Sequence, residues 1–523
     1  MDLHARMQWM GAISAGSHTR PVAGHAVYYA RHRPEQTLLY QVVEEYYPAF
    51  LNQMAIQGTT LPEYVQRDFD DYLKCGRLEY GFLRVRCTGC HQEQLVAFSC
   101  KRRGFCPSCG ARRMADSAAL LVDEVLPEVP LRQWVLSFPF PLRFLFASRP
   151  AVMGQVLGIV YRAIATHLIK KASDTKTTAQ TGAVTLIQRF GSALNLNIHF
   201  HMLFLDGAYR NTDTGSPRFQ WVSAPTAAEL SQLTHTLAQR IGRFLERQGL
   251  LERDTENSYL ALEALDDGPM SQIQGRSIAY RIAVGPQQGR KVFTLQTLPA
   301  REPYESFTDG LGKVSGFSLH AGVATKAHQR NKLECLCRYI ARPAVSEKRL
   351  SLTPHGQVCY QLKTPYRDGT THVIFEPLDF MYRMYGMPRA QGCAGAAVVR
   401  LAALVPKPRV NLTRFHGVFA PNSELRARIT PAKRGKGSKA KLSDEQDPTP
   451  RHIAMTWAQR LKRVFNIDIE TCSACGGAVK IIACIEGPVV IQKILDYLDA
   501  KVALADIQKL PESRAPPQAV LLS

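Results

Sequence analysis

Two histidines placed two residues apart are the clearest chemical feature of this 523-residue sequence. They lie in residues 195–204, NLNIHFHMLF, where even positions are apolar and positions 195–201 alternate with Asn and His. This period of two predicts a strand with one buried face, so that His199 and His201 project from the other, about 6.5–7 Å apart at Cα. Such a pair suits a catalytic divalent ion that polarises a phosphate, although structural histidines are the alternative.

The cysteines point to a second kind of metal site. Six of the 13 lie between residues 75 and 109, including two Cys-x-x-Cys pairs, Cys87 with Cys90 and Cys106 with Cys109. Two such pairs complete the tetrahedral sphere of structural zinc, and we predict one zinc bound by these four thiolates. Cys75 and Cys100 are left over, and either could replace a member or help to build a second site. A zinc deaminase is excluded, because its His-x-Glu would precede the Cys-x-x-Cys pair.

Basic residues surround the second cysteine pair. The cluster consists of Lys101, Arg102, Arg103, Arg112 and Arg113. A loop stiffened by metal would present these cations to phosphates, and we predict DNA phosphate contacts from Lys101, Arg102 and Arg103. A solvated basic face is the simpler alternative.

A tyrosine further along the chain is the candidate nucleophile. An apolar helix face is predicted from Leu333, Leu336, Cys337 and Ile340, with Pro343 ending the helix after Arg342. Tyr339 falls off that face, next to Arg338 and one turn from Arg342. Guanidinium groups in these positions stabilise a phenolate and hold a phosphate. By local sequence alone, Tyr339 would be only a partly exposed aromatic.

These residues need elements to position them. Helical spacing of apolar residues between Glu35 and Tyr72 predicts a helical lead-in (1–74), followed by a zinc-binding module (75–125). Segments 133–138 and 181–190 are predicted strands, 151–171 is a predicted helix, and Thr226 with Glu229 has the spacing of a capping box. Strands alternating with helices indicate an α/β or α+β class for residues 131–430, with a polar insertion at 251–310.

The C-terminal part has its own signals. Residues 431–450 carry a basic and then an acidic run without apolar periodicity, which predicts a linker. The remaining module (451–523) contains Cys472 and Cys475, a possible second metal site, with only Cys484 as a further cysteine nearby.

The charge of the sequence and its apolar runs limit the kinds of protein that it can be. The sequence has 65 Lys and Arg against 44 Asp and Glu, a formal charge of +21, which favours a polyanion as partner. No run of about 18 apolar residues and no leader-like start is visible, so the sequence predicts a protein that is neither secreted nor membrane-spanning. We expect a cytoplasmic protein, associated with the nucleoid of a bacterial cell through DNA.

Together these features resemble transposases of the insertion-sequence ninety-one (IS91) type, most closely the common-region (ISCR) branch. The resemblance runs from about Arg31 to the Cys472 pair and includes residues 33–40 (RPEQTLLY), 338–343 (RYIARP) and 414–422 (RFHGVFAPN). It implies an α+β HUH (His-hydrophobic-His) endonuclease domain, an antiparallel sheet with flanking helices, preceded by a small zinc-binding module. It also implies a single-strand DNA endonuclease that supports rolling-circle transposition through a 5′-phosphotyrosine.

The resemblance assigns roles by residue. His199 and His201 match the HUH ligands for Mg²⁺ or Mn²⁺, and Tyr339 matches the nucleophile. Cys335 stands where founding members have a second tyrosine, so a single-tyrosine enzyme is expected. His320 and His328 are candidates for the third ligand, and residues 381–399 interrupt a familiar segment.

The expected partner is DNA, mainly single-stranded element ends, with no membrane and no small-molecule substrate. A plasmid-type replication initiator or relaxase shares HUH chemistry but would not need the cysteine-rich front end. Outside enzymes, the alternative is a zinc-containing DNA-binding regulator whose histidines are structural.

Overall fold

The computed structural model describes residues 27–28, 33–210, 217–253, 258–260, 268–281, 290–296, 311–314, 316–366, 368–375, 395–434, 459 and 467–507. These residues form a mixed α+β structure with antiparallel sheets and two compact units. The first unit contains residues 37–73 and 101–466, and the second contains residues 26–36, 74–100 and 467–523. Residues 435–450 of the predicted 431–450 linker and residues 381–394 of the segment 381–399 lie outside the described ranges.

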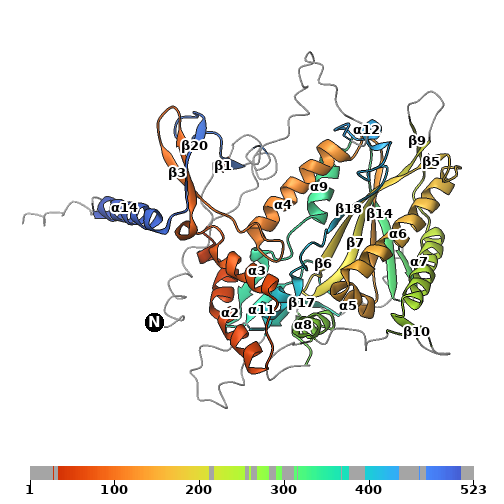
Figure 1. Ribbon diagram of the computed structural model, residues 1–523, viewed down its shortest axis with the longest axis horizontal. Coiled ribbons are helices and arrows are strands. Elements are labelled where there is room, and N and C mark those ends of the chain that lie inside the picture. The colour runs from red at the N-terminus through yellow and green to blue at the C-terminus, as the bar shows by residue number, and fades with distance from the viewer. Residues whose placement is uncertain are drawn as a thin grey trace, which may run out of the picture. The chain divides into compact units, whose positions relative to one another are not determined.

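A six-stranded sheet is the centre of the first unit, and every neighbouring pair in it is antiparallel. Its order is β13 (Leu311–Val314), β14 (Phe317–Thr325), β4 (Leu131–Ser137), β7 (Leu196–Leu205), β6 (Gly182–Phe190) and β18 (Thr413–Gly417). The strands predicted at 133–138, 181–190 and 195–204 are confirmed as β4, β6 and β7. The sheet and the helices that flank it are seen in Figure 1.

One face of this sheet is covered by the long helices of the domain. They are α5 (Phe140–Ser148), α6 (Pro150–Lys171) and α7 (Ala227–Arg247). The ring of Tyr161 on α6 stacks on Phe204 of β7, with centroids 5.8 Å apart. Thr226 and Glu229 make the predicted capping box at the start of α7. By length and composition alone α6 could cross a membrane, but half of its most apolar window is buried inside the fold.

The other face carries α4 (Pro107–Leu120) and α9 (Arg330–Ile340). The apolar side predicted for α9 is buried through Leu333, Cys337 and Ile340, which share one core with residues of α4, β6 and β7. The helix ends at Ile340 rather than at Arg342. Gly110 allows α4 to approach the next segment closely, since a Cβ at this position would lie 2.6 Å from Cβ of Pro343. The helix α4 therefore packs against the segment that follows α9, the helix that carries Tyr339.

Further elements complete the first unit. The predicted lead-in is confirmed as α2 (Leu38–Ile56) and α3 (Glu63–Lys74). A four-stranded sheet contains β12 (Phe293–Gln296), β17 (Thr370–Phe375), β16 (Val358–Gln361) and β15 (Leu350–Leu352), and a three-stranded sheet contains β5 (Ala179–Gln180), β8 (Gly207–Arg210) and β9 (Arg218–Trp221). Further elements are helices α8 (Pro269–Ile278) and α11 (Gly395–Leu404), strands β10 (Leu251–Arg253) and β11 (Ser258–Leu260), and the four-residue α12 (Arg426–Ile429). β12 and α8 fall within the predicted insertion, so part of it is ordered structure.

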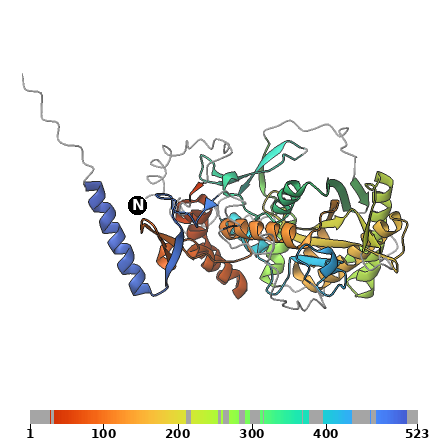
Figure 2. The same ribbon diagram turned by 90° about the horizontal axis from the view of Figure 1, so that it is seen from above.

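The second unit joins distant parts of the chain. Its three-stranded sheet has the order β20 (Val479–Ile485), β2 (Phe82–Cys87) and β3 (Glu93–Ala97), and it is followed by α14 (Pro488–Ile507). A parallel pair, β1 (Val27–Tyr28) with β19 (Ile467–Asp468), adds a second long-range link. Figure 2 shows the blue C-terminal strand beside the orange strands. The zinc-binding stretch and the C-terminal module, which the sequence analysis treats as separate, thus share one sheet.

Candidate active site and cysteine clusters

Strand β7 presents both histidines toward α9, as its alternation predicts. Its even positions are buried, and the two imidazoles share the opposite face with ring centroids 4.9 Å apart. His201 is opposite Val135 of β4 and Leu186 of β6, so it is in the middle of the sheet. The regular ladder on both sides holds the two rings on one face.

Hydrogen bonds orient each imidazole. His199 Nδ1 is 2.9 Å from the carbonyl oxygen of Asn197, to which it donates, leaving Nε2 with its lone pair. His201 Nδ1 is 2.7 Å from the side-chain amide of Gln133. The amide nitrogen Nε2 of Gln133 is the atom placed there. Once the amide is turned over, its oxygen accepts from Nδ1–H and leaves Nε2 of His201 with its lone pair, and such an outer partner fixes the ring of a metal-binding histidine.

Both imidazoles are neutral near pH 7. Burial lowers the pKa of His199 to about 4, and the nearby Arg342 and Arg143 add to this effect. The pKa of His201 is lowered further, to about 2, first by burial and then by His199 and Arg342. Only a neutral imidazole offers a lone pair to a metal, so this pair fits a divalent ion.

Tyr339 comes from α9 to the same place. Its ring centroid is 6.4 Å from that of His201 and the two rings are perpendicular, while 41% of the tyrosine remains exposed. The guanidinium carbon of Arg342 is 4.3 Å from the centre of the Tyr339 ring, and Nζ of Lys363 is 4.1 Å from it. Burial alone would raise the pKa of Tyr339, but Arg342 and Lys363 outweigh it and hold the pKa below its ordinary value.

The structure does not bring the two candidate third ligands to this pair. Within the described ranges, no His, Cys, Asp or Glu joins His199 and His201 in a group of three donors. His320 is on β14, with β4 between it and β7, because it pairs with Val135. His328 precedes α9 by two residues and is exposed. Gln133 is the side chain that touches His201, and sequence analysis missed it because it lies on another strand.

A complete cysteine cluster lies within the second unit. Cys87, Cys90, Cys472 and Cys475 bring their sulfur atoms within 4.8 Å of one another. The sulfur atoms of Cys87 and Cys475 are 3.4 Å apart, and those of Cys90 and Cys472 are 3.6 Å apart. Cys87 ends β2, and its partner strand β20 follows Cys475 directly, so the sheet itself brings the two pairs together.

The backbone around this cluster is that of a metal-binding turn. Gly476 has φ +72°, which favours glycine, and a Cβ on Gly477 would crowd the sulfur of Cys87 at 3.0 Å. The N–H groups of Cys90 and Gly89 lower the pKa of Cys87 to about 6. Although the N–H of Gln92 lowers the pKa of Cys90, hydrogen bonds to Cys475 and Cys472 raise it to about 12. One thiol thus keeps a proton beside the Cys87 thiolate, as expected when like charges crowd together.

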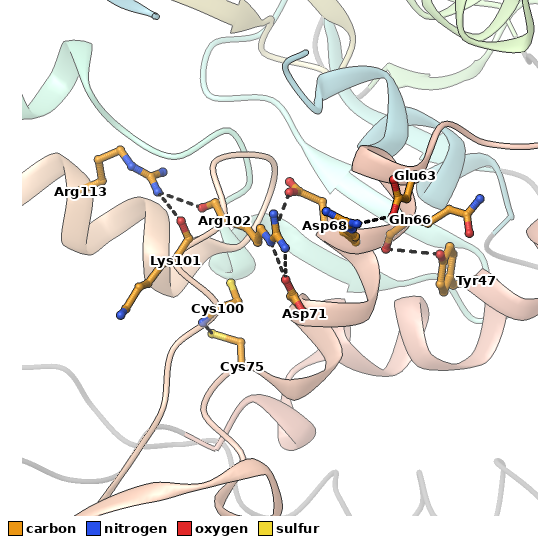
Figure 3. A network of polar contacts seen from close by, with 11 residues as sticks. Tyr47, Glu63, Gln66, Asp68, Asp71, Cys75, Cys100, Lys101, Arg102 and Arg113 are labelled. Carbon is orange, nitrogen blue, oxygen red and sulfur yellow. Dashed lines mark hydrogen bonds and ion pairs between the residues drawn. The ribbon is translucent and has the colours of Figure 1, made fainter. Parts of the chain in front are cut away.

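The other group of four is Cys75, Cys100, Cys106 and Cys109, whose sulfur atoms also lie within 4.8 Å of one another. The N–H of Cys100 donates to the sulfur of Cys75 at 3.3 Å (Figure 3), and Cys106 is the N-cap of α4. The predicted pairing of Cys87 and Cys90 with Cys106 and Cys109 is therefore wrong. Each Cys-x-x-Cys turn supplies two of the four ligands of a site. The spacing within the turn does not identify the two cysteines that complete it. Cys484, by contrast, is exposed and in neither cluster.

The predicted phosphate-binding cations differ in their surroundings. Arg102 forms ion pairs with Asp68 and Asp71, so its charge is already offset (Figure 3). Arg103 donates to the carbonyl oxygen of Val410, and Arg338 donates to the sulfur of Cys335. Lys101 is exposed. Lys363, which the sequence analysis missed, lies between β16 and β17 and places its Nζ 4.1 Å from the centre of the Tyr339 ring.

Comparison with known families agrees with this arrangement. The transposase model Y2_Tnp matches residues 182–387, and a model described as a transposase zinc-binding domain, Zn_Tnp_IS91, matches residues 42–138. Together they cover more than half of the chain. The chain belongs to the IS91 family of transposases. No curated protein and no solved structure matches it.

The matched ranges divide the candidate site residues of this transposase. The zinc-binding match contains all six cysteines between Cys75 and Cys109, and the two four-cysteine clusters support Zn²⁺ as a cofactor. The other match contains both histidines and Tyr339. Cys472 and Cys475 lie outside both ranges, and only the fold shows that they complete a zinc-binding cluster.

Proposed function

We propose that this transposase is an HUH-type, single-tyrosine strand transferase, which nicks and rejoins single-stranded DNA at the ends of its element through a 5′-phosphotyrosine. One observation carries the proposal: Tyr339 stands 6.4 Å from His201, perpendicular to it, beside two neutral histidines and two cations. The six-stranded antiparallel sheet with helices on both faces supports an HUH domain. A DNA-binding regulator would have no use for this placement of a tyrosine.

The chemistry follows from the residues. The phenolate oxygen of Tyr339 attacks the scissile phosphorus, and the bond to the 3′-oxygen breaks, so that this oxygen leaves and takes a proton from water. Arg342 and Lys363 stabilise the phenolate before attack and neutralise phosphate charge during it. His199 and His201, through their Nε2 atoms, would hold Mg²⁺ or Mn²⁺, which supplies polarisation of the phosphate. Storing the bond as phosphotyrosine permits rejoining by the reverse reaction.

Cys335 supports a single-tyrosine reaction. It occupies α9 one turn before Tyr339, is exposed, and accepts a hydrogen bond from Arg338. No second tyrosine on this helix can therefore relay the strand. We also propose that the protein acts in the cytoplasm, where single-stranded element ends arise.

The test is a cleavage assay with the full-length protein. Single-stranded oligonucleotides that cover the DNA flanking its gene are incubated with Mg²⁺ or Mn²⁺, and covalent adducts are resolved in denaturing gels. Tyr339→Phe should bind DNA and metal but form no adduct, a loss of roughly 10³-fold or more because the attacking atom is gone. His201→Ala should lose cleavage together with metal binding.

Tyr366→Phe is the matched control, since Tyr366 is a half-buried tyrosine that contacts Ser192 rather than the histidines. Peptide mapping of the wild-type adduct should recover Tyr339 attached to a 5′-phosphate. Adduct formation by Tyr339→Phe at the wild-type rate, or a labelled peptide containing Tyr360 or Tyr366, would show that the nucleophile is another residue.

A further inference from the structure

A cavity of 280 Å³ opens beside the end of α9, the helix that carries Tyr339. Its walls come from residues 102–117 around the start of α4, residues 186–190 at the end of β6, residues 340–344 after α9, and residues 404–413 before β18. This volume lies just below the usual range for ligand pockets, roughly 300–1,000 Å³. It has room for one nucleotide and not for a duplex.

The cavity is strongly cationic. No Asp or Glu is among its lining residues, which include Arg102, Arg103, Arg113, Arg189 and Arg342. Of these, Arg102 is offset by Asp68 and Asp71 (Figure 3). Arg103 and Arg189 donate to carbonyl oxygens of Val410, Leu404 and Ala403, which leaves their charge in place. Burial lowers the pKa of Arg189 only to about 10, so it remains charged at neutral pH.

Its inner wall is suited to a base. Leu186, Ile187 and Phe190 give it an apolar surface at the end of β6. Gln188, which is 4% exposed, donates from Nε2 to the carbonyl oxygen of Ile340 at 2.5 Å, while its Oε1 is buried without a hydrogen-bond partner. A buried acceptor without a donor is costly, and an amino group entering the cavity would satisfy it.

Arg342 connects this cavity to the nucleophile. It lines the cavity, its guanidinium carbon is 5.6 Å from the centre of the Phe190 ring, and the same carbon is 4.3 Å from the Tyr339 ring. A phosphate held by Arg342 at Tyr339 would therefore have its neighbouring nucleotide at the mouth of the cavity.

Resting on the function proposed above, we propose that this cavity binds one nucleotide of the cleaved strand, next to the phosphate that Tyr339 attacks. Arg103 and Arg189 hold its phosphate, its base stacks on Phe190, and Oε1 of Gln188 accepts a hydrogen bond from its exocyclic amino group. Adenine, cytosine and guanine carry such a group and thymine does not. The cavity is thus a specificity site as well as a binding site.

The test uses full-length Tyr339→Phe protein, which cannot form an adduct, and titrates it with dAMP, dCMP, dGMP, dTMP and inorganic phosphate at low salt. We expect dTMP to bind at least fivefold more weakly than the best of the other three, and phosphate more weakly still. Arg103→Gln should lower nucleotide affinity at least fivefold. Arg240→Gln, the matched loss of one charge from an exposed position of α7 outside the cavity lining, should bind as the parent does.

Equal affinities of the Arg103 and Arg240 variants, or phosphate binding as tight as nucleotide binding, would overturn the proposal. Gln188→Leu should erase the difference between dCMP and dTMP, and a difference that persists in this folded variant would overturn the role of Gln188. Failure of the strand-transfer proposal looks different: wild-type protein would form no adduct, while nucleotide binding would still depend on Arg103.

Discussion

The four-cysteine cluster of the second unit and the histidine–tyrosine site of the first differ in what keeps their side chains in place. Cys87 and Cys475 meet across 388 positions of sequence, in a small sheet with few large buried side chains. His199, His201 and Tyr339 stand on a strand and a helix that a large apolar core fixes from behind. We therefore expect the first arrangement to need a metal to persist and the second to be held by its core without one.

This difference sets the expected response to mutation. At the cysteine cluster, losing one ligand should remove both metal and fold. At the histidine–tyrosine site, losing one functional group should remove activity and leave the fold.

The largest effect is expected at the cysteines. Cys475→Ser should lower bound zinc from two ions per chain to one and unfold the β20–β2–β3 sheet, since zinc binding contributes about 10–16 kcal/mol in such modules. Metal analysis and hydrogen exchange of residues 82–97 and 479–485 would measure both losses. Cys484→Ser is the control, because Cys484 is exposed and outside both clusters.

The same assay decides which cysteines share an ion. Removing Cys87 and Cys90 should release one zinc, removing Cys106 and Cys109 should release the other, and the combined variant should hold none. If either double variant released both ions, or if the two losses did not add, the clusters would be coupled and the grouping seen in the structure would be incorrect.

DNA affinity should depend on the charge of the chain more than on either site. With a formal charge of +21, binding to single strands should weaken about 10³-fold or more between 50 and 200 mM salt if some six to ten phosphates are contacted. Zinc content should not change over this range. An affinity that barely responds to salt would contradict the prediction.

The two regions also differ in what sequence can reveal. The face of β7 that carries His199 and His201 followed from a period of two, and the buried side of α9 followed from helical spacing, because both patterns are local. The predicted lead-in helices and the capping box of Thr226 are local in the same sense. These parts of the fold and of the site could be read directly from the sequence.

Pairing between distant segments could not be predicted from the sequence. The spacing of Cys87 and Cys90 predicts a metal-binding turn, but its partner pair is selected by the register of β2 with β20, which no local pattern encodes. Gln133 and Lys363 reach His201 and Tyr339 for the same reason, from a neighbouring strand and from the turn before β17. Strand pairing is therefore the part of the fold that could not be predicted from the sequence.

A smaller effect is expected where the orientation of a histidine is lost. Gln133→Leu should weaken Mn²⁺ binding by about 10–100-fold, because the amide no longer fixes the ring of His201. Calorimetric titration with Mn²⁺ measures this independently of cleavage. Gln180→Leu, on an exposed position of β5, is the matched control. Unchanged Mn²⁺ affinity in Gln133→Leu would mean that the amide does not orient a ligand.

The smallest effect is expected from Lys363→Met, and it should appear as a displacement along the pH axis. Lys363 and Arg342 hold the pKa of Tyr339 below its ordinary value, so removing one cation raises that pKa. If the phenolate attacks, the rising limb of the cleavage rate should move to higher pH. At a pH below the pKa of Tyr339, the variant should be slower than wild type by about tenfold for every unit by which that pKa rises. At high pH the two rates should be equal. Lys348→Met removes the same charge from an exposed position after Tyr339 and should leave the profile in place. A uniform fall in rate at every pH would instead indicate that Lys363 acts on the phosphate alone, and the tyrosine would then owe its reactivity to Arg342.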